Sequence, residues 1–385
     1  MCHQCNEHPA STEHDLTPPL PRHRRLPSGF TLLELLIVCI ILSLLLLVVG
    51  PGLARTRQTA RLAMCENTLH AFGQGMLIYT LDNQEYIPGT NTSGVTTRER
   101  DLLPERLSPS TVPVQSFDWM TPILQDQPLP DNRADRWHYL WTEFACPLQS
   151  RTALLYAGGA VADYSDFVVH TPWPACSYLM PTYFQLWGSN HAGMLLGAHE
   201  ETAAPIYAQT VQSGSEVASS TFRSRIDAVG SPVRKVFVAD GTRYMSADGL
   251  IDCDISATPT YFGAFSSGGA WTSISTAYGV ASGSKDWSGR PVYAGNPSNG
   301  LNIPASYRHP PAFPFMPLAG QAGGIPSPRS VRGNRGAMNV VCFDGHVERL
   351  NDEPSRDIDR WYPSGCVVKS PSMGLIAEPY GYVIP

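Results

Sequence analysis

One segment of this 385-residue chain is almost entirely apolar, and it limits the folds that the chain can adopt. The twenty residues Phe30–Val49 read FTLLELLIVCIILSLLLLVV and contain a single charge, Glu34. As a helix, such a segment is about 30 Å long, which matches the hydrocarbon core of a bilayer. A buried core helix is the alternative, but the length of the run and its density of leucine favour the membrane. We therefore predict a single-pass transmembrane helix over residues 30–50.

The composition indicates a loop-rich but folded protein. Lysine and arginine together number 27 and aspartate and glutamate 33, which gives a net charge of −6. Phosphate binding needs clustered basic residues, so nucleic acid is excluded as the main partner. Glycine and proline number 33 and 34, so turns and loops are abundant. With 43% apolar residues, the chain can still bury a core.

A short motif stands where the apolar run begins. A carboxylate five residues into a membrane span, as at Glu34, costs roughly a few kcal/mol and therefore needs a reason. The string Gly29-Phe30-Thr31-Leu32-Leu33-Glu34, followed by an unbroken apolar run, resembles the cleavage and methylation signal of type IV prepilins and type II secretion pseudopilins. The resemblance implies that a prepilin peptidase cuts between Gly29 and Phe30 and methylates the new amine of Phe30. It also implies that Glu34 pairs with that amine in a neighbouring subunit.

Residues 1–29 would then be a leader peptide. Arg22, Arg24 and Arg25 place positive charge on the side of the membrane that we expect to be cytoplasmic. Further arginines follow the apolar run, so charge alone leaves the orientation open; they are Arg55, Arg57 and Arg61. The leader is longer than the usual form and contains Cys2 and Cys5, which lack a second pair of metal ligands. We interpret these cysteines as an incidental part of the leader, or as a sign that the start codon is assigned too far upstream.

Residues 51–82 have the pattern of an amphipathic stem helix that packs on the domain that follows. Cys65-Glu-Asn-Thr-Leu69 and the exit Asp82-Asn-Gln-Glu-Tyr86-Ile-Pro88 resemble a subgroup of pilin-like proteins abundant in planctomycetes and their relatives. Six apolar residues are spaced three or four apart and would lie on one face of the helix. These residues, the stem stripe below, are Leu62, Cys65, Leu69, Phe72, Met76 and Tyr79.

The remaining residues, 83–385, are expected to form a β-rich extracytoplasmic head. Two β-prone runs, 235–239 and 339–343, each lead into an Asp-Gly pair, which predicts β-hairpins with type I′ turns. The second run is apolar on both faces and is therefore predicted to be a central strand. The whole pattern predicts an α+β fold, in which a long N-terminal helix (membrane anchor plus stem) packs on an antiparallel β-sheet head with long loops.

The second Asp-Gly pair carries a further resemblance. Asp344-Gly345-His346 resembles the end of the subgroup's C-terminal domain, which is named for a histidine that is followed, after nine residues, by Asp-Gly. The residue ten positions before Asp344 is Asn334, and the nearest Arg-His pair contains His309, which would require an insertion. Either Asn334 or His309 can therefore correspond to the family histidine.

Two groups of side chains are candidates for metal binding. Asp344, His346 and His309 have suitable chemistry, but an exposed polar turn is the favoured interpretation. A looser acidic cluster offers oxygen ligands to calcium, the only cofactor that we consider, although its spacing is not that of an EF-hand. No HExxH, GxSxG or phosphate-loop pattern appears, so we expect no enzyme. The acidic cluster consists of Asp248, Asp252 and Asp254.

Six cysteines lie beyond the apolar run, and an even number permits disulfides in an oxidising compartment. Their pairing is open from spacing alone. The Cys146-Pro147 step resembles one in the subgroup, and that resemblance implies a disulfide from Cys146 to Cys65. If Cys342 lies in a central strand, it is alternatively a buried thiol. The six candidates are Cys65, Cys146, Cys176, Cys253, Cys342 and Cys366.

Two functional hypotheses remain. The first is a pilin-like or pseudopilin subunit of a type IV pilus or type II secretion-type filament. Its partners would be prepilin peptidase, other pilin-like subunits, an assembly platform and membrane lipid around residues 30–50. It would be held in the cytoplasmic membrane, with the N-terminus cytoplasmic. The alternative is a membrane-tethered binding module that does not polymerise, with glycan recognition by eight tryptophans and sixteen tyrosines.

Overall fold

The computed structural model describes most of the stem and about half of the head. Its described parts are residues 31–95, 104–147, 152–155, 161–199, 202–211, 217–241, 337–351, 357–368 and 381–385, with residue 354 and short pieces between 251 and 267.

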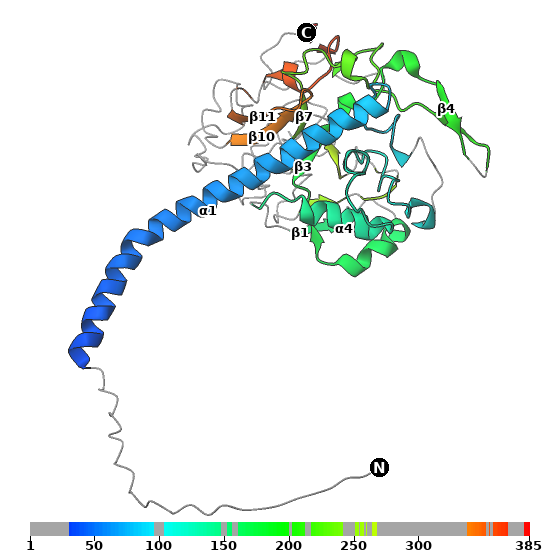
Figure 1. Cartoon of the computed structure of the whole chain (residues 1–385). Coiled ribbons are helices and arrows are strands. Elements are labelled where there is room, and N and C mark those ends of the chain that lie inside the picture. Colours follow the sequence, from blue (N-terminus) through cyan, green and yellow to red (C-terminus); the bar gives the residue numbers. More distant parts are fainter. Residues whose placement is uncertain are drawn as a thin grey trace, which may run out of the picture. The chain divides into compact units, whose positions relative to one another are not determined.

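One helix, α1 (Leu32–Asp82), dominates the N-terminal part of the chain (Figure 1). Contacts group residues 1–56 and residues 57–385 as two separate units, so the second half of α1 belongs with the head. The helix ends where Gln84 and Glu85 adopt positive φ angles of 55° and 67°, a left-handed conformation that stops a helix. The N–H of Glu85 donates to the carbonyl oxygen of Thr80 at 2.7 Å and closes the last turn.

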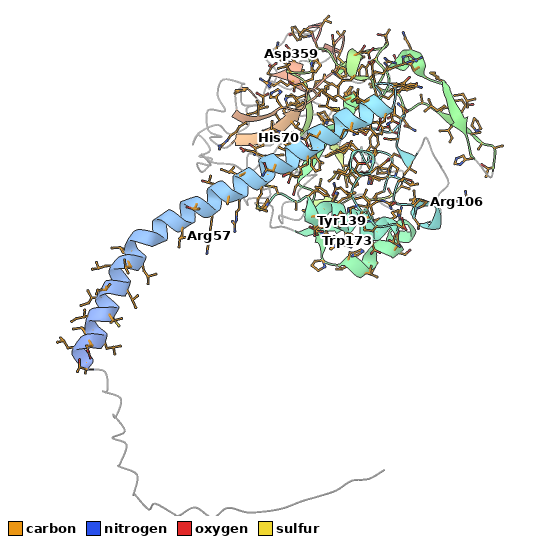
Figure 2. The ribbon with its side chains drawn as sticks, in the orientation of Figure 1. Arg57, His70, Arg106, Tyr139, Trp173 and Asp359 are labelled. Atoms are coloured by element: carbon orange, nitrogen blue, oxygen red, sulfur yellow. A yellow bond between two sulfur atoms is a disulfide. The ribbon has the colours of Figure 1, made fainter. Side chains whose placement is uncertain are left out.

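The second half of α1 contributes the stem stripe to the core of the head. Cys65, Leu69, Phe72 and Met76 are completely buried, and Tyr79 is nearly so. Leu62, at the beginning of the stripe, is half-buried. His70 lies on the exposed side of the same helix (Figure 2).

A five-stranded sheet faces the stem, with the strand order β11-β10-β7-β3-β9. Its first three pairings are antiparallel, and β9 joins β3 in parallel. The expected α+β class is confirmed, but the sheet is mixed rather than purely antiparallel. The strand expected at 339–343 lies between two neighbours, as predicted. The strands are β3 (Tyr178–Pro181), β7 (Val236–Asp240), β9 (Ser266–Ser267), β10 (Ala337–Cys342) and β11 (Val347–Asn351).

The two faces of this sheet bury two different cores. Val341 and Phe343 pack into the core that contains the stem stripe. Val340 and Cys342 point to the other face and pack with residues near the C-terminus, among them Trp361. Alternation along β10 therefore supplies both cores, which explains why both faces of this strand are apolar.

Smaller elements complete the described head. A three-stranded sheet has the order β2-β1-β8, with β1 and β8 parallel, and two pairs, β4-β5 and β6-β12, are antiparallel. The strands are β1 (Thr152–Leu155), β2 (Trp173–Pro174), β4 (Leu195–Ala198), β5 (Pro205–Tyr207), β6 (Val217–Ala218), β8 (Ile251–Cys253) and β12 (Val367–Val368). The α-helices are α3 (Met120–Ile123) and α4 (Arg133–Glu143), and the 3-10 helices are η1 (Pro104–Leu107), η2 (Val161–His170), η3 (Thr182–Phe184), η4 (Ser189–His191), η5 (Ile226–Ala228) and η8 (Ile358–Arg360).

The first half of α1 exposes large apolar side chains, from Leu32 to Leu47. Within the part of the chain that the structure describes, no helix is both long enough and apolar enough to cross a membrane. The span expected over residues 30–50 is therefore not confirmed.

Two glycines explain how closely the stem approaches the head. A Cβ at Gly73 would lie 2.8 Å from a methyl carbon of Val341, and a Cβ at Gly75 would lie 2.3 Å from the carbonyl oxygen of Ile123. Both distances are shorter than a real contact. The two glycines weaken the helix by about 1 kcal/mol each but permit this approach.

We expect Gly75→Ala to lower the free energy of unfolding of the head by about 1–3 kcal/mol in urea denaturation, because the new methyl group meets backbone. Gly52→Ala in the same helix is the matched control, since a Cβ at Gly52 meets nothing within 4 Å. The control should leave unfolding of the head unchanged. A stabilising Gly75→Ala would mean that the stem does not lie this close to Ile123.

Candidate functional site

The first candidate site is the start of α1, next to the bond that is expected to be cleaved. Gly29 and Phe30 lie outside the described residues. The Glu34 carboxylate accepts from the backbone N–H and from the hydroxyl of Thr31, both at 2.9 Å, and the N–H of Glu34 donates to the Thr31 hydroxyl at 3.2 Å. This reciprocal pair is a capping box, which satisfies donors that a helix N-terminus leaves unpaired.

The capping role of Glu34 was not predicted, although the spacing Thr-x-x-Glu is its known signal. Both bonds from Thr31 end on one carboxylate oxygen, Oε2. The other oxygen, Oε1, can therefore accept from a further donor without breaking the cap. A charged amine is the kind of donor that a carboxylate binds most strongly.

The exit of the stem is held by a single arginine. Arg225 contacts the Glu85 carboxylate at 2.6 Å and the Asp227 carboxylate at 3.0 Å, and its guanidinium lies over the ring of Tyr86 at 5.6 Å. The backbone is joined at the same place, because the N–H of Ile87 donates to the Ser224 carbonyl at 2.7 Å. The acidic Tyr-x-Pro exit thus fixes where the chain leaves α1.

The second candidate site is the hairpin between β10 and β11, which contains Asp344, Gly345 and His346. The N–H of Gly345 donates to the Cys342 carbonyl at 2.9 Å, and the N–H of Cys342 donates to the His346 carbonyl at 3.0 Å. Gly345 has φ +86°, whereas Asp344 is not among the described residues with positive φ. The hairpin at Asp344-Gly345 is confirmed, but the type I′ turn that was predicted for it is wrong. The loop has three residues and ends in a left-handed glycine, which places the bulge at Gly345.

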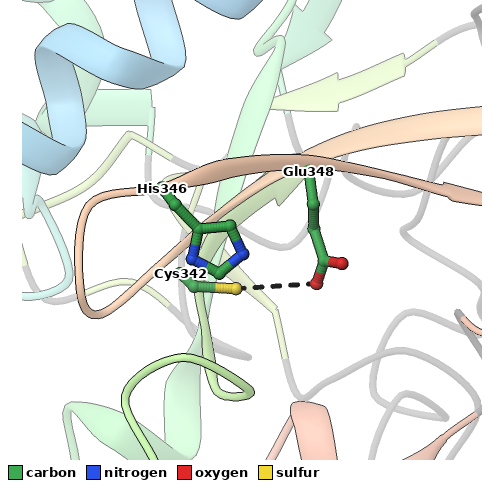
Figure 3. A group of neighbouring side chains, drawn as sticks. All are labelled: Cys342, His346 and Glu348. Carbon is green, nitrogen blue, oxygen red and sulfur yellow. Dashed lines mark hydrogen bonds between the residues drawn. The ribbon is translucent and has the colours of Figure 1, made fainter.

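Four polar side chains gather at this hairpin. Nδ1 of His346 lies 2.5 Å from Oδ1 of Asp344, and Sγ of Cys342 donates to Oε1 of Glu348 at 3.7 Å (Figure 3). One ligand atom each of Cys342, His346 and Glu348 lie within 4.8 Å of one another. Burial, with the nearby carboxylates of Glu348 and Asp344, raises the pKa of the Cys342 thiol well above its usual range. Glu348 also forms an ion pair with Arg360.

Asp344 and His346 were predicted to lie together, whereas Cys342 and Glu348 were not expected beside them. The sequence positions of Cys342 and Glu348 show that they lie beside His346 only once the hairpin register is known. His309 and Asn334 lie outside the described residues, as do Asp248 and Asp254 and the side chain of Asp252. The hairpin predicted at Asp240-Gly241 is wrong, because β7 pairs with β10 on one side and with β3 on the other, which leaves no edge for a strand that follows Gly241.

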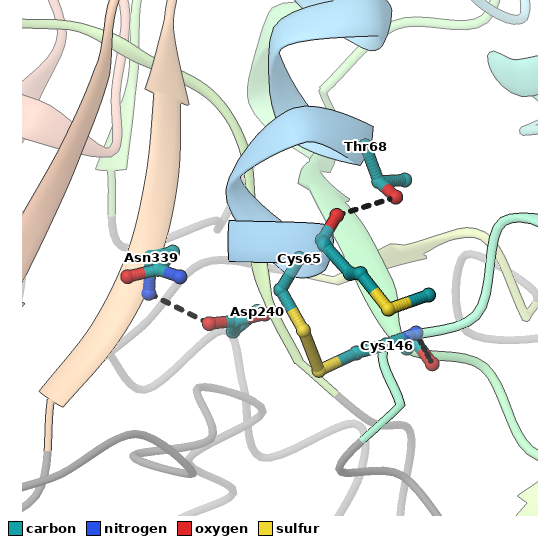
Figure 4. The surroundings of a disulfide bond; sticks show 7 residues. Cys65, Thr68, Cys146, Asp240 and Asn339 are labelled. Carbon is teal, nitrogen blue, oxygen red and sulfur yellow. Dashed lines mark hydrogen bonds between the residues drawn. A yellow bond between two sulfur atoms is a disulfide. The ribbon is translucent and has the colours of Figure 1, made fainter. Parts of the chain in front are cut away.

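A disulfide joins the stem to the head. Cys65 on α1 is bonded to Cys146, just after α4, with their Cα atoms 5.1 Å apart (Figure 4). This is the pair that the family resemblance implies. The N–H of Cys146 donates to the Ser177 hydroxyl at 3.1 Å, and this bond anchors the loop side of the bridge.

The structure does not place Cys342 and Cys366 in disulfides. Both are buried with free thiols in the core on the far side of the sheet. Burial raises the pKa of Cys366 to about 12, so this thiol stays protonated. The alternative of a buried thiol therefore holds for Cys342. The Cys176 thiol donates to the Tyr178 carbonyl at 3.0 Å, and the side chain of Cys253 lies outside the description.

We expect the double variant Cys65→Ser/Cys146→Ser to lose about 2–4 kcal/mol of unfolding free energy, because the bridge spans 81 positions of sequence and restrains the unfolded chain. Urea denaturation with and without reductant measures the effect. Reductant should bring the wild-type midpoint down to that of the variant and leave the variant unchanged. A wild-type midpoint that does not respond to reductant would show that the bridge does not hold the stem.

Comparison with known families identifies one region of the chain. The prokaryotic N-terminal methylation motif matches residues 24–50, a range that includes the expected cleavage position and the start of α1. No curated protein and no solved structure matches the chain. The chain therefore carries a prepilin-type N-terminal methylation motif, as pilin-like proteins processed by prepilin peptidase do.

Proposed function

We propose that this protein is a pilin-like structural subunit that an assembly platform draws from the cytoplasmic membrane into a type IV pilus or type II secretion-type filament. The observation that carries the proposal is the methylation motif at residues 24–50, which includes the start of α1. Prepilin peptidase would cut between Gly29 and Phe30, and the new amine of Phe30 would be methylated.

The exposed apolar side chains of α1 support the proposal, because they need lipid or protein to shield them from water. Side chains from Leu32 to Leu47 expose roughly half or more of their surface, an apolar area that soluble monomers rarely leave open. In the proposal, lipid covers them before assembly, and the same segment of neighbouring subunits covers them afterwards. The head would lie outside the cytoplasm, a location that suits the Cys65–Cys146 disulfide.

Glu34 would provide the register between subunits. Its Oε2 oxygen caps the helix through Thr31, and its Oε1 oxygen would accept from the Phe30 amine of a neighbouring subunit. A buried ammonium without a partner costs about 3–5 kcal/mol. The register that pairs each Phe30 amine with a Glu34 carboxylate would therefore be strongly preferred. We propose no enzymatic activity for the head.

A tethered glycan-binding module receives less support. Such a module would stack sugars on exposed aromatic rings. The six tryptophans whose side chains the structure describes are all buried. Among the described tyrosines, Tyr207 is exposed, with 46% of its surface open to solvent. Among the described side chains, Tyr207 is therefore the aromatic ring most open to stacking; Trp271, Trp287 and several tyrosines lie outside them.

We expect Glu34→Gln to remove the protein from sheared filaments by at least about tenfold while cleavage after Gly29 continues, because an unpaired amine is costly to bury. Glutamine can still cap the helix through Thr31, so this variant separates the charge from the cap. Immunoblots of the sheared and membrane fractions, with N-terminal sequencing of both, measure assembly and cleavage.

Glu66→Gln on the same helix is the matched control and should assemble as the wild type does. Recovery of Glu34→Gln in filaments at the wild-type level would contradict the role of the carboxylate. A wild-type chain that is cleaved but never appears in the sheared fraction would favour the tethered alternative.

A further inference from the structure

The register of the β10–β11 hairpin places three metal-binding side chain types on one face of the sheet. Val340 pairs with Glu348, and Val341 pairs with Val347. The next residues along the two strands, Cys342 and His346, are linked through a backbone hydrogen bond of 3.0 Å. Because side chains alternate between faces, Cys342, His346 and Glu348 share a face, opposite to that of Val341. Figure 3 shows their side chains converging beside the hairpin.

We propose that Cys342, His346 and Glu348 bind a divalent transition metal ion, with Zn²⁺ the preferred ion. A thiolate, an imidazole and a carboxylate form a mixed sulfur, nitrogen and oxygen set that suits zinc. Calcium and magnesium prefer oxygen ligands and would gain little from Cys342 and His346. The ligand atoms of Cys342, His346 and Glu348 already lie within 4.8 Å of one another, so side-chain rotation brings them to bonding distance from an ion. Three protein ligands leave a fourth position for water or an external ligand.

Asp344 is positioned to orient the histidine. Its Oδ1 atom lies 2.5 Å from Nδ1 of His346, so the histidine donates from Nδ1 and keeps Nε2 for a metal. A carboxylate behind a metal-binding histidine is the usual supporting partner in zinc sites. The turn itself is seated on the stem, since a Cβ at Gly345 would lie 3.1 Å from a methyl carbon of Leu77. The hairpin therefore presents these residues from a fixed backbone.

Glu348 has partners that a metal would replace. Its carboxylate accepts from Cys342 and is paired with Arg360. When the ion binds, the S–H bond of Cys342 breaks, its proton passes to solvent, and a sulfur–metal bond forms. Glu348 exchanges the guanidinium for the metal. Arg360 keeps an acidic neighbour, because its Nε lies 3.5 Å from an Asp357 carboxylate oxygen.

Cobalt titration of the full-length protein tests the proposal, because a cobalt–thiolate bond has an ultraviolet charge-transfer band. The protein should carry Cys2→Ser and Cys5→Ser and a purification tag without histidine, so that the leader and the tag bind no metal. It should be handled without reductant, which keeps the Cys65–Cys146 bridge closed, and without air, which keeps Cys342 a free thiol. We expect the band to saturate at one equivalent of Co²⁺ and to disappear when Zn²⁺ is added.

Variants then assign the ligands. Cys342→Ser should abolish the band, whereas Cys366→Ser, a second buried thiol of the same core, should retain it. His346→Gln should weaken binding of Co²⁺ and Zn²⁺ strongly. His346 is partly exposed, so this variant keeps the test valid if Cys342→Ser fails to fold. Asp344→Asn should keep the band but lower affinity by about 10–100-fold.

Four results would overturn the proposal. The first is the absence of a charge-transfer band in the parent protein. The second is a band that survives Cys342→Ser in a folded protein, and the third is a band that Cys366→Ser removes equally. Unchanged affinity in His346→Gln would also contradict it.

Discussion

The packing of Phe72 of the stem against the rings around it determines where α1 lies on the head. The Phe72 ring meets Trp119 edge to face at 5.0 Å and Tyr178 at 5.5 Å, and Phe144 lies at 5.7 Å. These contacts join α1 to β3, to the residue that precedes α3 and to the residue that follows α4. Edge-to-face pairs of this kind add about 0.5–1.5 kcal/mol each to the burial of the rings. The glycines at 73 and 75 permit this close approach, and the Cys65–Cys146 bridge joins the same two parts covalently.

A tightly held stem has a functional consequence. Glu34 and the stem stripe lie on the same helix, α1. Any displacement of residues 57–82 of α1 would also displace the head, through the stripe, the disulfide and the Arg225 contacts at the exit. The proposed subunit role therefore needs no mobile linker between residues 57 and 88.

The features that the sequence predicted are those encoded by local patterns. The α+β class, the hairpin at Asp344-Gly345 and the central position of residues 339–343 follow from short periodicities and a turn signal. The turn type was wrong because Asp-Gly suits both a type I′ turn and a loop that ends in a left-handed glycine. Strand order was beyond prediction, since β3, β7 and β10 are separated by long stretches of chain. The grouping of Cys342, His346 and Glu348 depended on register in the same way.

The mass and N-terminal sequence of the protein extracted from its native membrane test the central claim most directly. The account predicts a chain that begins at Phe30 and carries one additional methyl group on its amine. A chain that retains residues 1–29, or one cut after Val49 as in ordinary secretion, would contradict it.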